Sequence, residues 1–183
     1  MMVLTHIAVG MALSLPVAAV APEFATATAI GGAIGGAVPD VDLLVGDHRR
    51  TLHFPVLYWL PAIALTAVAL VAIPIVVVAA VAVSAAAVHS VSDVLGAGEE
   101  LRPWERTNTD AVYDHLRGQW LRARYVVRYD GAPEDFVLTV AFSTPVAVCF
   151  QGLPRWIAVS TVVVALPYTL ARKRLADQFE KIL

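Results

Sequence analysis

The chain consists largely of long runs of Ala, Val, Leu and Ile that ionisable side chains hardly interrupt. Its 183 residues are 58% hydrophobic and have a mean hydropathy of +0.71, which exceeds the apolar share of an ordinary soluble domain. An α-helix needs roughly 20 residues to cross about 30 Å of hydrocarbon, and several runs approach that length. The sequence therefore predicts an all-α, polytopic membrane helix bundle that forms one domain over residues 1–183.

Six apolar segments are candidate membrane helices, namely 2–21, 24–38, 55–73, 74–91, 136–151 and 156–171. The second is short and contains the glycine pairs 31–32 and 35–36, which favours either close helix packing or incomplete crossing. Pro74 divides the long run over 55–91 into two segments. The first segment ends in small residues as a secretory signal does, but no Lys or Arg precedes Arg49. We therefore expect a first span and not a cleaved signal.

Basic residues gather in two loops, 39–54 and 95–135, and in the tail that begins at Arg172, which together hold every Lys and Arg except Arg155. Cytoplasmic loops carry the excess of Lys and Arg, so six alternating passes place these segments on the inner side. We expect a multi-pass protein of the inner membrane with both termini in the cytoplasm.

The polar loop 95–135 contains a helix-start signal, Asn108-Thr109-Asp110. Apolar residues then recur at helical spacing over 111–120. This pattern predicts an amphipathic cytoplasmic-side helix that lies on the membrane surface.

Charge and cysteine usage exclude some classes of function. Charged residues make up 15% of the chain and the net charge is −2, too few and too balanced for a nucleic-acid-binding protein. The single cysteine, Cys149, excludes an intrachain disulfide and a thiolate metal cluster.

His and Asp side chains stand close to one boundary of the predicted bundle. They are His6, Asp40, Asp42, His48, His53, His89 and Asp93. Placing imidazole and carboxylate groups near hydrocarbon costs free energy, and the same groups bind divalent metal ions. Because the six-pass order brings all seven to the inner boundary, the sequence predicts a metal site there.

Spacing indicates how these groups could meet. His89 and Asp93 are four residues apart, so on one helix both can reach one ion; a hydrogen bond within the helix is the alternative. His48 and His53 are five apart and would diverge by about 140° on a straight helix, so at least one lies in irregular backbone or acts from outside the ligand set. His6 could instead be a hydrogen-bonded packing residue.

The neighbouring charges have two interpretations. Arg49 and Arg50 could hold a phosphate or carboxylate through the guanidinium fork, or could simply be topogenic charge. Asp40 and Asp42 follow Pro39 and could belong to an ordinary solvated turn. The acidic residues Glu99, Glu100 and Glu105 are interpreted as solvated, with a general base among them as the alternative.

An ordered set of motifs extends over roughly the first 105 residues: Thr5-His6 with Gly10, Pro39-Asp40-Val41-Asp42, His48-Arg49 with His53, and His89 and Asp93 followed by Gly96, Gly98 and Pro103. It resembles the pattern of the membrane-bound metal-dependent hydrolases, a family also described as LexA-binding, inner membrane-associated hydrolases. A more distant similarity is to zinc-dependent phospholipase C and P1-type nucleases. The resemblance implies one or two divalent ions, zinc or alternatively manganese, with ligands His6, Asp40, His53, His89 and Asp93.

The expected function is hydrolysis of a phosphoester on a membrane lipid or other amphiphile at the cytoplasmic interface. The metal would activate water and polarise the phosphoryl oxygen, while Arg49 or Arg50 stabilises the developing charge. Asp42 and His48 would support the ligands or act as base. The alternative is a metal-binding membrane scaffold or an ion transporter, although a transporter should carry polar residues through the bilayer midplane.

Overall fold

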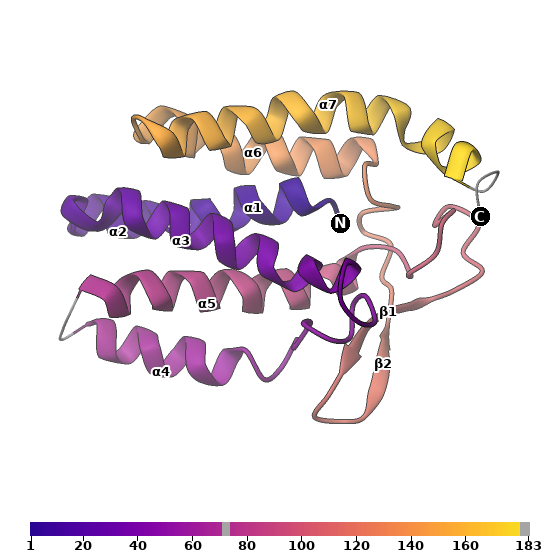
Figure 1. Cartoon of the computed structure of the whole chain (residues 1–183), viewed down its shortest axis with the longest axis horizontal. Coiled ribbons are helices and arrows are strands. Elements are labelled where there is room, and N and C mark those ends of the chain that lie inside the picture. The colour runs from indigo at the N-terminus through magenta and orange to yellow at the C-terminus, as the bar shows by residue number, and fades with distance from the viewer. Residues whose placement is uncertain (71–73, 180–183) are drawn as a thin grey trace.

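The computed structural model of the chain describes residues 1–70 and 74–179 and is mostly helical (Figure 1). The helices are α1 (Val3–Ala12), α2 (Leu15–Val20), α3 (Ala25–Ala37), α4 (Trp59–Ala69), α5 (Pro74–Ser92), α6 (Pro133–Cys149) and α7 (Leu153–Phe179), with short 3-10 helices η1 (Pro22–Phe24), η2 (Val38–Leu43) and η3 (Asp93–Leu95). Two strands, β1 (Asp110–Asp114) and β2 (Gln119–Arg122), form an antiparallel hairpin.

Three helices are long and apolar enough to cross a membrane. They cover Val3–Val20, which includes both α1 and α2, Ile75–Leu95 and Leu153–Gln178. The helix Trp59–Ala69 is apolar but shorter, because the segment expected to begin at residue 55 forms turns before Trp59; residues 71–73 of that expected span lie outside the described part. The prediction of six membrane segments is therefore not supported.

Proline positions explain several helix boundaries. Pro16 lies in the first turn of α2, and the chain turns at Leu13 and Ser14 between α1 and α2. Pro39 lies in the first turn of η2 and Pro133 begins α6. Because proline lacks an amide hydrogen, it is well tolerated in a first helical turn, whereas an interior proline such as Pro145 in α6 or Pro167 in α7 removes a backbone hydrogen bond. The first candidate span, Val3–Val20, therefore consists of two helices, α1 and α2.

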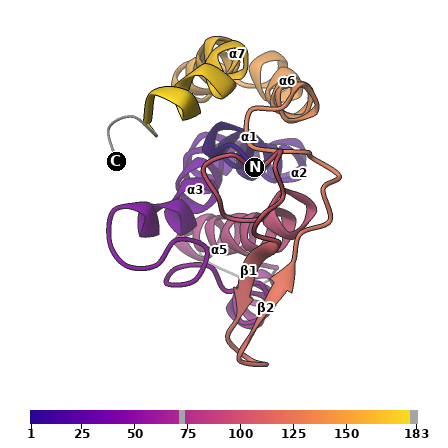
Figure 2. The ribbon, with the colours of Figure 1, turned by 90° about the vertical axis from the view of Figure 1, so that its right-hand side faces the viewer.

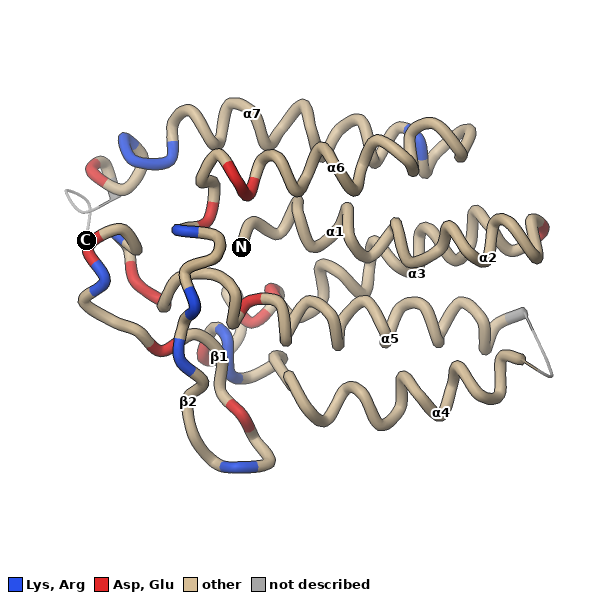
Figure 3. The backbone as a smooth tube through the Cα atoms, turned by 180° about the vertical axis from the view of Figure 1, so that it is seen from behind, with Lys and Arg blue, Asp and Glu red and all other residues tan. Residues whose placement is uncertain are grey.

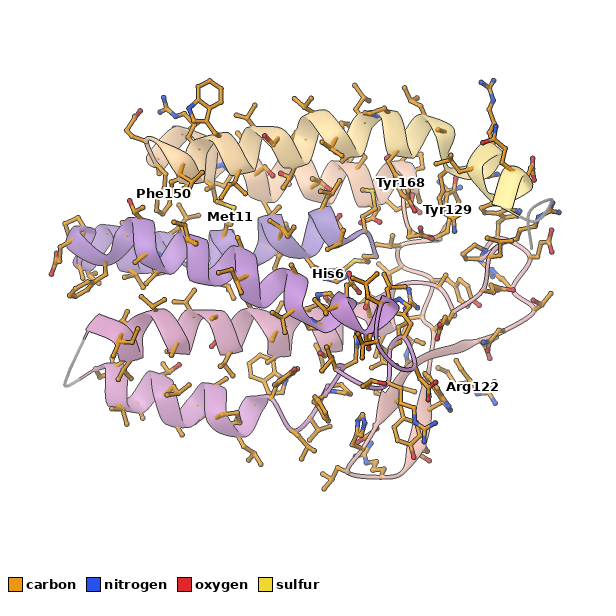
Figure 4. The ribbon with its side chains drawn as sticks, in the orientation of Figure 1. His6, Met11, Arg122, Tyr129, Phe150 and Tyr168 are labelled. Carbon is orange, nitrogen blue, oxygen red and sulfur yellow. The ribbon has the colours of Figure 1, made fainter. Side chains whose placement is uncertain are left out.

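Helix α1 is central in the bundle. It packs on α3, α5, α6 and α7, while α3 packs on α5, α4 on α5 and α6 on α7. A buried apolar cluster joins α1, α3, α6 and α7: Met11, Ala29, Ala33, Val146, Phe150 and Ala158. In Figure 4 the labelled Met11 and Phe150 lie in the half of the bundle away from the loops, and His6 lies in the half near them.

Glycines allow three of the helices to approach closely. A side chain at Gly32 would collide with the backbone of Gly10, one at Gly36 with the carbonyl of His6, and one at Gly35 with the carbonyl of Ala82. These contacts join α3 to α1 and α5, in agreement with the expectation of close packing for this segment. They fix the distance between α1 and α5, which carry His6 and His89, and α3, which leads into η2 with Asp40 and Asp42.

The predicted amphipathic helix over 111–120 is wrong, and the fold is not purely helical, because this stretch forms the β1–β2 hairpin. Tyr113 pairs with Trp120 across the strands, and Gly118 adopts a positive φ of 67° in the turn. The Asp114 carboxylate accepts the amides of Leu116 and Arg117. Aromatic cross-strand pairing and a glycine turn favour a hairpin over a helix in so short a segment.

Charged residues gather at one end of the bundle. Figure 3 shows Lys and Arg almost entirely at the end that carries the loops and the hairpin, with one further basic position near the start of α7. Figure 2 looks onto this end and shows the connecting segments spread across it, with α6 and α7 on one side and the hairpin on the other. The start of α1 lies at the same end.

Candidate metal centre

Four side chains from three separate parts of the chain converge at the charged end of the bundle. Asp40 comes from η2, His53 from the irregular segment before α4, and His89 and Asp93 from the end of α5 and the start of η3. Their ligand atoms lie within 4.8 Å of one another. We call these four residues the His/Asp tetrad.

Five of the six separations between the tetrad atoms are those of ligands around a tetrahedral metal ion. His89 Nε2 lies 3.3 Å from Asp40 Oδ1 and 3.4 Å from Asp93 Oδ2. His53 Nε2 lies 3.6 Å from Asp40 Oδ1, 3.3 Å from Asp93 Oδ2 and 3.2 Å from His89 Nε2. Nitrogen and oxygen ligands about 2.0–2.2 Å from a zinc ion stand about 3.3–3.6 Å apart in a tetrahedron. Charge-assisted hydrogen bonds would be shorter, about 2.7–2.9 Å.

Contacts outside the tetrad determine which ring nitrogens face inward without a proton. His89 Nδ1 lies 2.6 Å from the carbonyl oxygen of Gly36, and His53 Nδ1 lies 2.8 Å from Asp42 Oδ2. Because both partners are acceptors, each Nδ1 donates its hydrogen, and in the neutral ring Nε2 then carries a lone pair. With both rings neutral, two imidazole lone pairs and two carboxylate oxygens face one point, so this buried group could hold a metal ion.

Burial strengthens the case for a cation at this point. The side chains of His53 and His89 are 0% exposed and that of Asp93 is 2% exposed. Asp40 is 12% exposed and is the tetrad member nearest to solvent. Clustered lone pairs shielded from water are costly unless a cation neutralises them.

Asp42 holds two of the predicted histidines without belonging to the tetrad. Its Oδ1 accepts a hydrogen bond from His48 Nδ1 at 2.8 Å, and its Oδ2 accepts from His53 Nδ1 and from the amide of Leu52. The Asp42 side chain is completely buried. Carboxylates that orient ligand imidazoles in this way are common around metal ions. The 48–53 segment is irregular, as the five-residue spacing of its histidines required.

His6 lies against the tetrad and outside it. Its Nε2 lies 2.9 Å from Asp93 Oδ1, the oxygen that faces away from the two histidines, and the terminal amino group of Met1 donates to the same oxygen. The His6 ring stacks on His89 with a centroid distance of 3.6 Å. His6 is therefore placed to orient Asp93 and His89, whereas the resemblance implied a direct ligand.

The two predicted arginines have different surroundings. Arg49 is 7% exposed, has a positive φ of 58°, and donates from Nη1 to the carbonyl of Ala97 at 2.6 Å. Its backbone carbonyl accepts the amide of Tyr113 in β1, so the hairpin helps to position it. Arg50 is exposed, pairs with Asp47 and stacks on Tyr113. Only Arg49 is buried beside the centre.

A cavity of about 360 Å³ adjoins the tetrad. Its wall includes Asp40, His48 and Arg49 together with Glu99 and Glu100, and apolar residues from the start of α1. Burial raises the pKa of the Glu99 carboxyl, an effect that the nearby His48 and Arg49 oppose. Glu99 is thus half-buried in the cavity wall and not fully solvated as the sequence suggested. Small-molecule sites in proteins have volumes on the order of 300–1,000 Å³.

Two contributions to the site could not be predicted from the sequence. The Gly36 carbonyl orients His89, and no sequence pattern marks a backbone acceptor. Arg172 was expected to be a charge of the basic tail, but it is 8% exposed, pairs with Asp130 at 2.7 Å and lines the cavity. Its spacing from Tyr168, which contacts the same carboxylate, is the one signal that could have indicated this.

Comparisons with protein-family models, with curated proteins and with solved structures returned no match.

We expect Asp42→Asn to weaken metal binding by about 10–100-fold, as loss of a partner outside the ligand set does at other metal sites. The amide nitrogen of asparagine cannot accept a hydrogen bond, so one of the two histidines loses its acceptor. The measurement is competitive titration against a chelator, with circular dichroism as the check of folding. Unchanged affinity in a folded Asp42→Asn protein would contradict the role given to Asp42.

Proposed function

We propose that the protein is a membrane-bound, metal-dependent hydrolase that cleaves a phosphoester of a lipid or other amphiphile. The observation that carries the proposal is the position of the tetrad, whose inward lone pairs fit a divalent ion and whose Asp40 lines the adjoining cavity. The resemblance of the motifs to the membrane-bound metal-dependent hydrolases supports the same activity. Zinc is the expected ion, with manganese as the alternative.

The position of the site suits an amphiphilic substrate. It lies at the charged end of a bundle that contains three helices of membrane length. An end with this charge distribution suits a membrane–water interface, and its excess of Lys and Arg supports the proposal that it lies on the cytoplasmic side of an inner membrane. A headgroup at that depth could enter the cavity while its chain remains in hydrocarbon.

Two polar residues of the cavity wall, His48 and Arg49, have a task in this proposal. A bound divalent ion would supply a Lewis acid that polarises the phosphoryl group and increases the acidity of water. His48 donates from Nδ1 to Asp42, so its Nε2 is free to accept a proton from the attacking water. Arg49, fixed by the Ala97 carbonyl, is placed to stabilise negative charge on the phosphate.

A structural metal is the second candidate, and the tetrad itself favours it. Four protein ligands complete a tetrahedron, whereas catalytic zinc usually has three protein ligands and an open position. An ion transporter has less support, because the buried cluster around Met11, Val146 and Phe150 is apolar. Thr28, Ser143 and Thr161, which are buried in α3, α6 and α7, carry hydroxyl groups and no charge.

The two candidates differ in the effect of His48→Ala. We expect this variant to retain its metal and to lose hydrolysis by about 10²–10⁴-fold, the range for a general base. The assay is release of phosphorylated headgroups from mixed phospholipid micelles by the metal-loaded protein, followed by ³¹P NMR. The scaffold alternative predicts no metal-dependent release from the wild type. That result would refute the hydrolase.

A further inference from the structure

Two residues that line the cavity each have a buried charged atom without a partner in the described part of the chain. Arg49 Nε and Glu100 Oε1 are both buried and make no hydrogen bond there. Leaving a charged donor or acceptor buried and unpaired costs on the order of 1–3 kcal/mol or more, and such atoms are rare in native structures. Both residues line the same cavity, so one ligand with two different ends could satisfy both.

Arg49 requires an anionic group. It is 7% exposed, its Nη1 is occupied by the Ala97 carbonyl, and Nε remains to donate. The other arginine in the wall, Arg172, is already neutralised, because its Nε and Nη2 both donate to Asp130. Arg49 is therefore the cation of this cavity that a phosphate can use.

Glu99 and Glu100 require a cationic group. Glu100 Oε2 accepts hydrogen bonds from Thr107 and Asn108, which fixes the side chain and leaves Oε1 unpaired. Glu99 lines the cavity as well. The two carboxylates would repel a purely anionic ligand, whereas an ammonium group would form charge-assisted hydrogen bonds with them.

The wall also distinguishes between kinds of ammonium. Quaternary ammonium groups are recognised by cages of aromatic rings, and Tyr168 is the one aromatic residue among the described residues of the wall. Carboxylate oxygens accept hydrogen bonds from N–H, which a primary ammonium has and a quaternary one lacks. The wall thus suits a primary ammonium.

We propose that the cavity binds a zwitterionic phosphate ester of the phosphoethanolamine type, with the phosphate at Arg49 and the primary ammonium at Glu99 and Glu100. This inference rests on the proposed function for the presence of the metal beside the phosphate. The same chemistry occurs in a phosphatidylethanolamine headgroup and in a soluble ester. The volume of about 360 Å³ suits a group of headgroup size.

The test measures binding of soluble phosphoethanolamine, glycerol phosphate and phosphocholine to the metal-loaded protein in detergent by titration calorimetry. We expect phosphoethanolamine to bind about tenfold more tightly than the other two, a ratio that a charge-assisted hydrogen bond can supply. Glu99→Gln and Glu100→Gln should each reduce this ratio severalfold without weakening the binding of glycerol phosphate. The matched control is Glu105→Gln, which changes an exposed carboxylate of the same loop and should leave the ratio unchanged.

A second arm separates the two sources of the ligand. Vesicles of phosphatidylethanolamine and of phosphatidylglycerol are compared as substrates by ³¹P NMR. Faster cleavage of phosphatidylethanolamine identifies the lipid headgroup, and a preference confined to soluble phosphoethanolamine identifies the free ester.

Equal binding of the three soluble esters would overturn the inference, as would a ratio that neither Glu99→Gln nor Glu100→Gln changes. Hydrolysis of every headgroup at equal rates would overturn it while leaving the proposed hydrolase intact. Conversely, selective binding without any turnover would refute the hydrolase and support the binding site. The two failures are thus distinguishable.

Discussion

Asp93→Ala is expected to abolish metal retention and to eliminate hydrolysis. Asp93 contributes the tetrad oxygen that lies 3.3 Å from His53 Nε2 and 3.4 Å from His89 Nε2. Its other oxygen accepts from His6. One substitution therefore removes a ligand and releases a stacked histidine, and metal affinity should fall by more than the roughly 10–100-fold that loss of an outer partner causes. The measurement is the metal content of the purified variant together with its headgroup release.

Two further variants make the Asp93 experiment decisive. Asp93→Asn preserves the shape and supplies a weaker ligand, so it tests the charge if Asp93→Ala fails to fold. Asp47→Asn is the matched control, because Asp47 is an exposed carboxylate at the same end of the bundle, and it should retain wild-type metal. Retention of metal and hydrolysis by a folded Asp93→Ala protein would refute the assignment of the tetrad.

Gly35→Ala is expected to destabilise the protein and to release the metal, although the substitution raises helix propensity. Alanine in place of glycine within a helix is favourable by about 1 kcal/mol. The new Cβ, however, would collide with the Ala82 carbonyl in α5. Overpacking of this kind costs typically 1–3 kcal/mol and occasionally more, so the steric effect outweighs the propensity. The displaced α3 would carry Asp40 and the Gly36 carbonyl away from His89.

The readouts for Gly35→Ala are thermal unfolding in detergent and metal content. Ile34→Ala is the matched control, because Ile34 lies next to Gly35 on α3 and is 57% exposed. We expect the control to keep both its melting temperature and its metal. A Gly35→Ala protein as stable as the wild type would show that the contact between α3 and α5 does not position the site.

The sequence predicted the helices of this fold better than their number of membrane passes. Apolar runs and Pro74 mark the boundaries of the helices well because both act through local backbone chemistry. Whether a helix reaches membrane length depends on where turns intervene, as at residues 55–58 before α4, and composition does not reveal that. The hairpin was not predicted because the apolar residues over 111–120 are too few to distinguish the period of a helix from that of a strand. The cross-strand pair of Tyr113 and Trp120 decides in favour of the strands.

The candidate site was predictable to the extent that chemistry depends on residue type. Histidine and aspartate near apolar runs have few structural reasons to be there, so their positions indicated a site. The roles of individual residues depended on geometry that the sequence does not carry. One example is His6, which contacts the outer oxygen of Asp93 and does not join the four ligand atoms. Another is the pair Arg49 and Arg50, of which only Arg49 is buried. Both outcomes follow from the path of the backbone around η2 and β1. Such details arise only from tertiary packing.

X-ray absorption at the metal edge of the detergent-purified, metal-loaded protein tests the central claim most directly. The account predicts about one tightly bound divalent ion in a shell of nitrogen and oxygen ligands at about 2.0–2.2 Å, with the outer scattering of imidazole rings. The signal should disappear in Asp93→Ala and persist in Asp47→Asn. A protein that holds no ion after loading, or an ion surrounded by water without imidazole, would contradict the account.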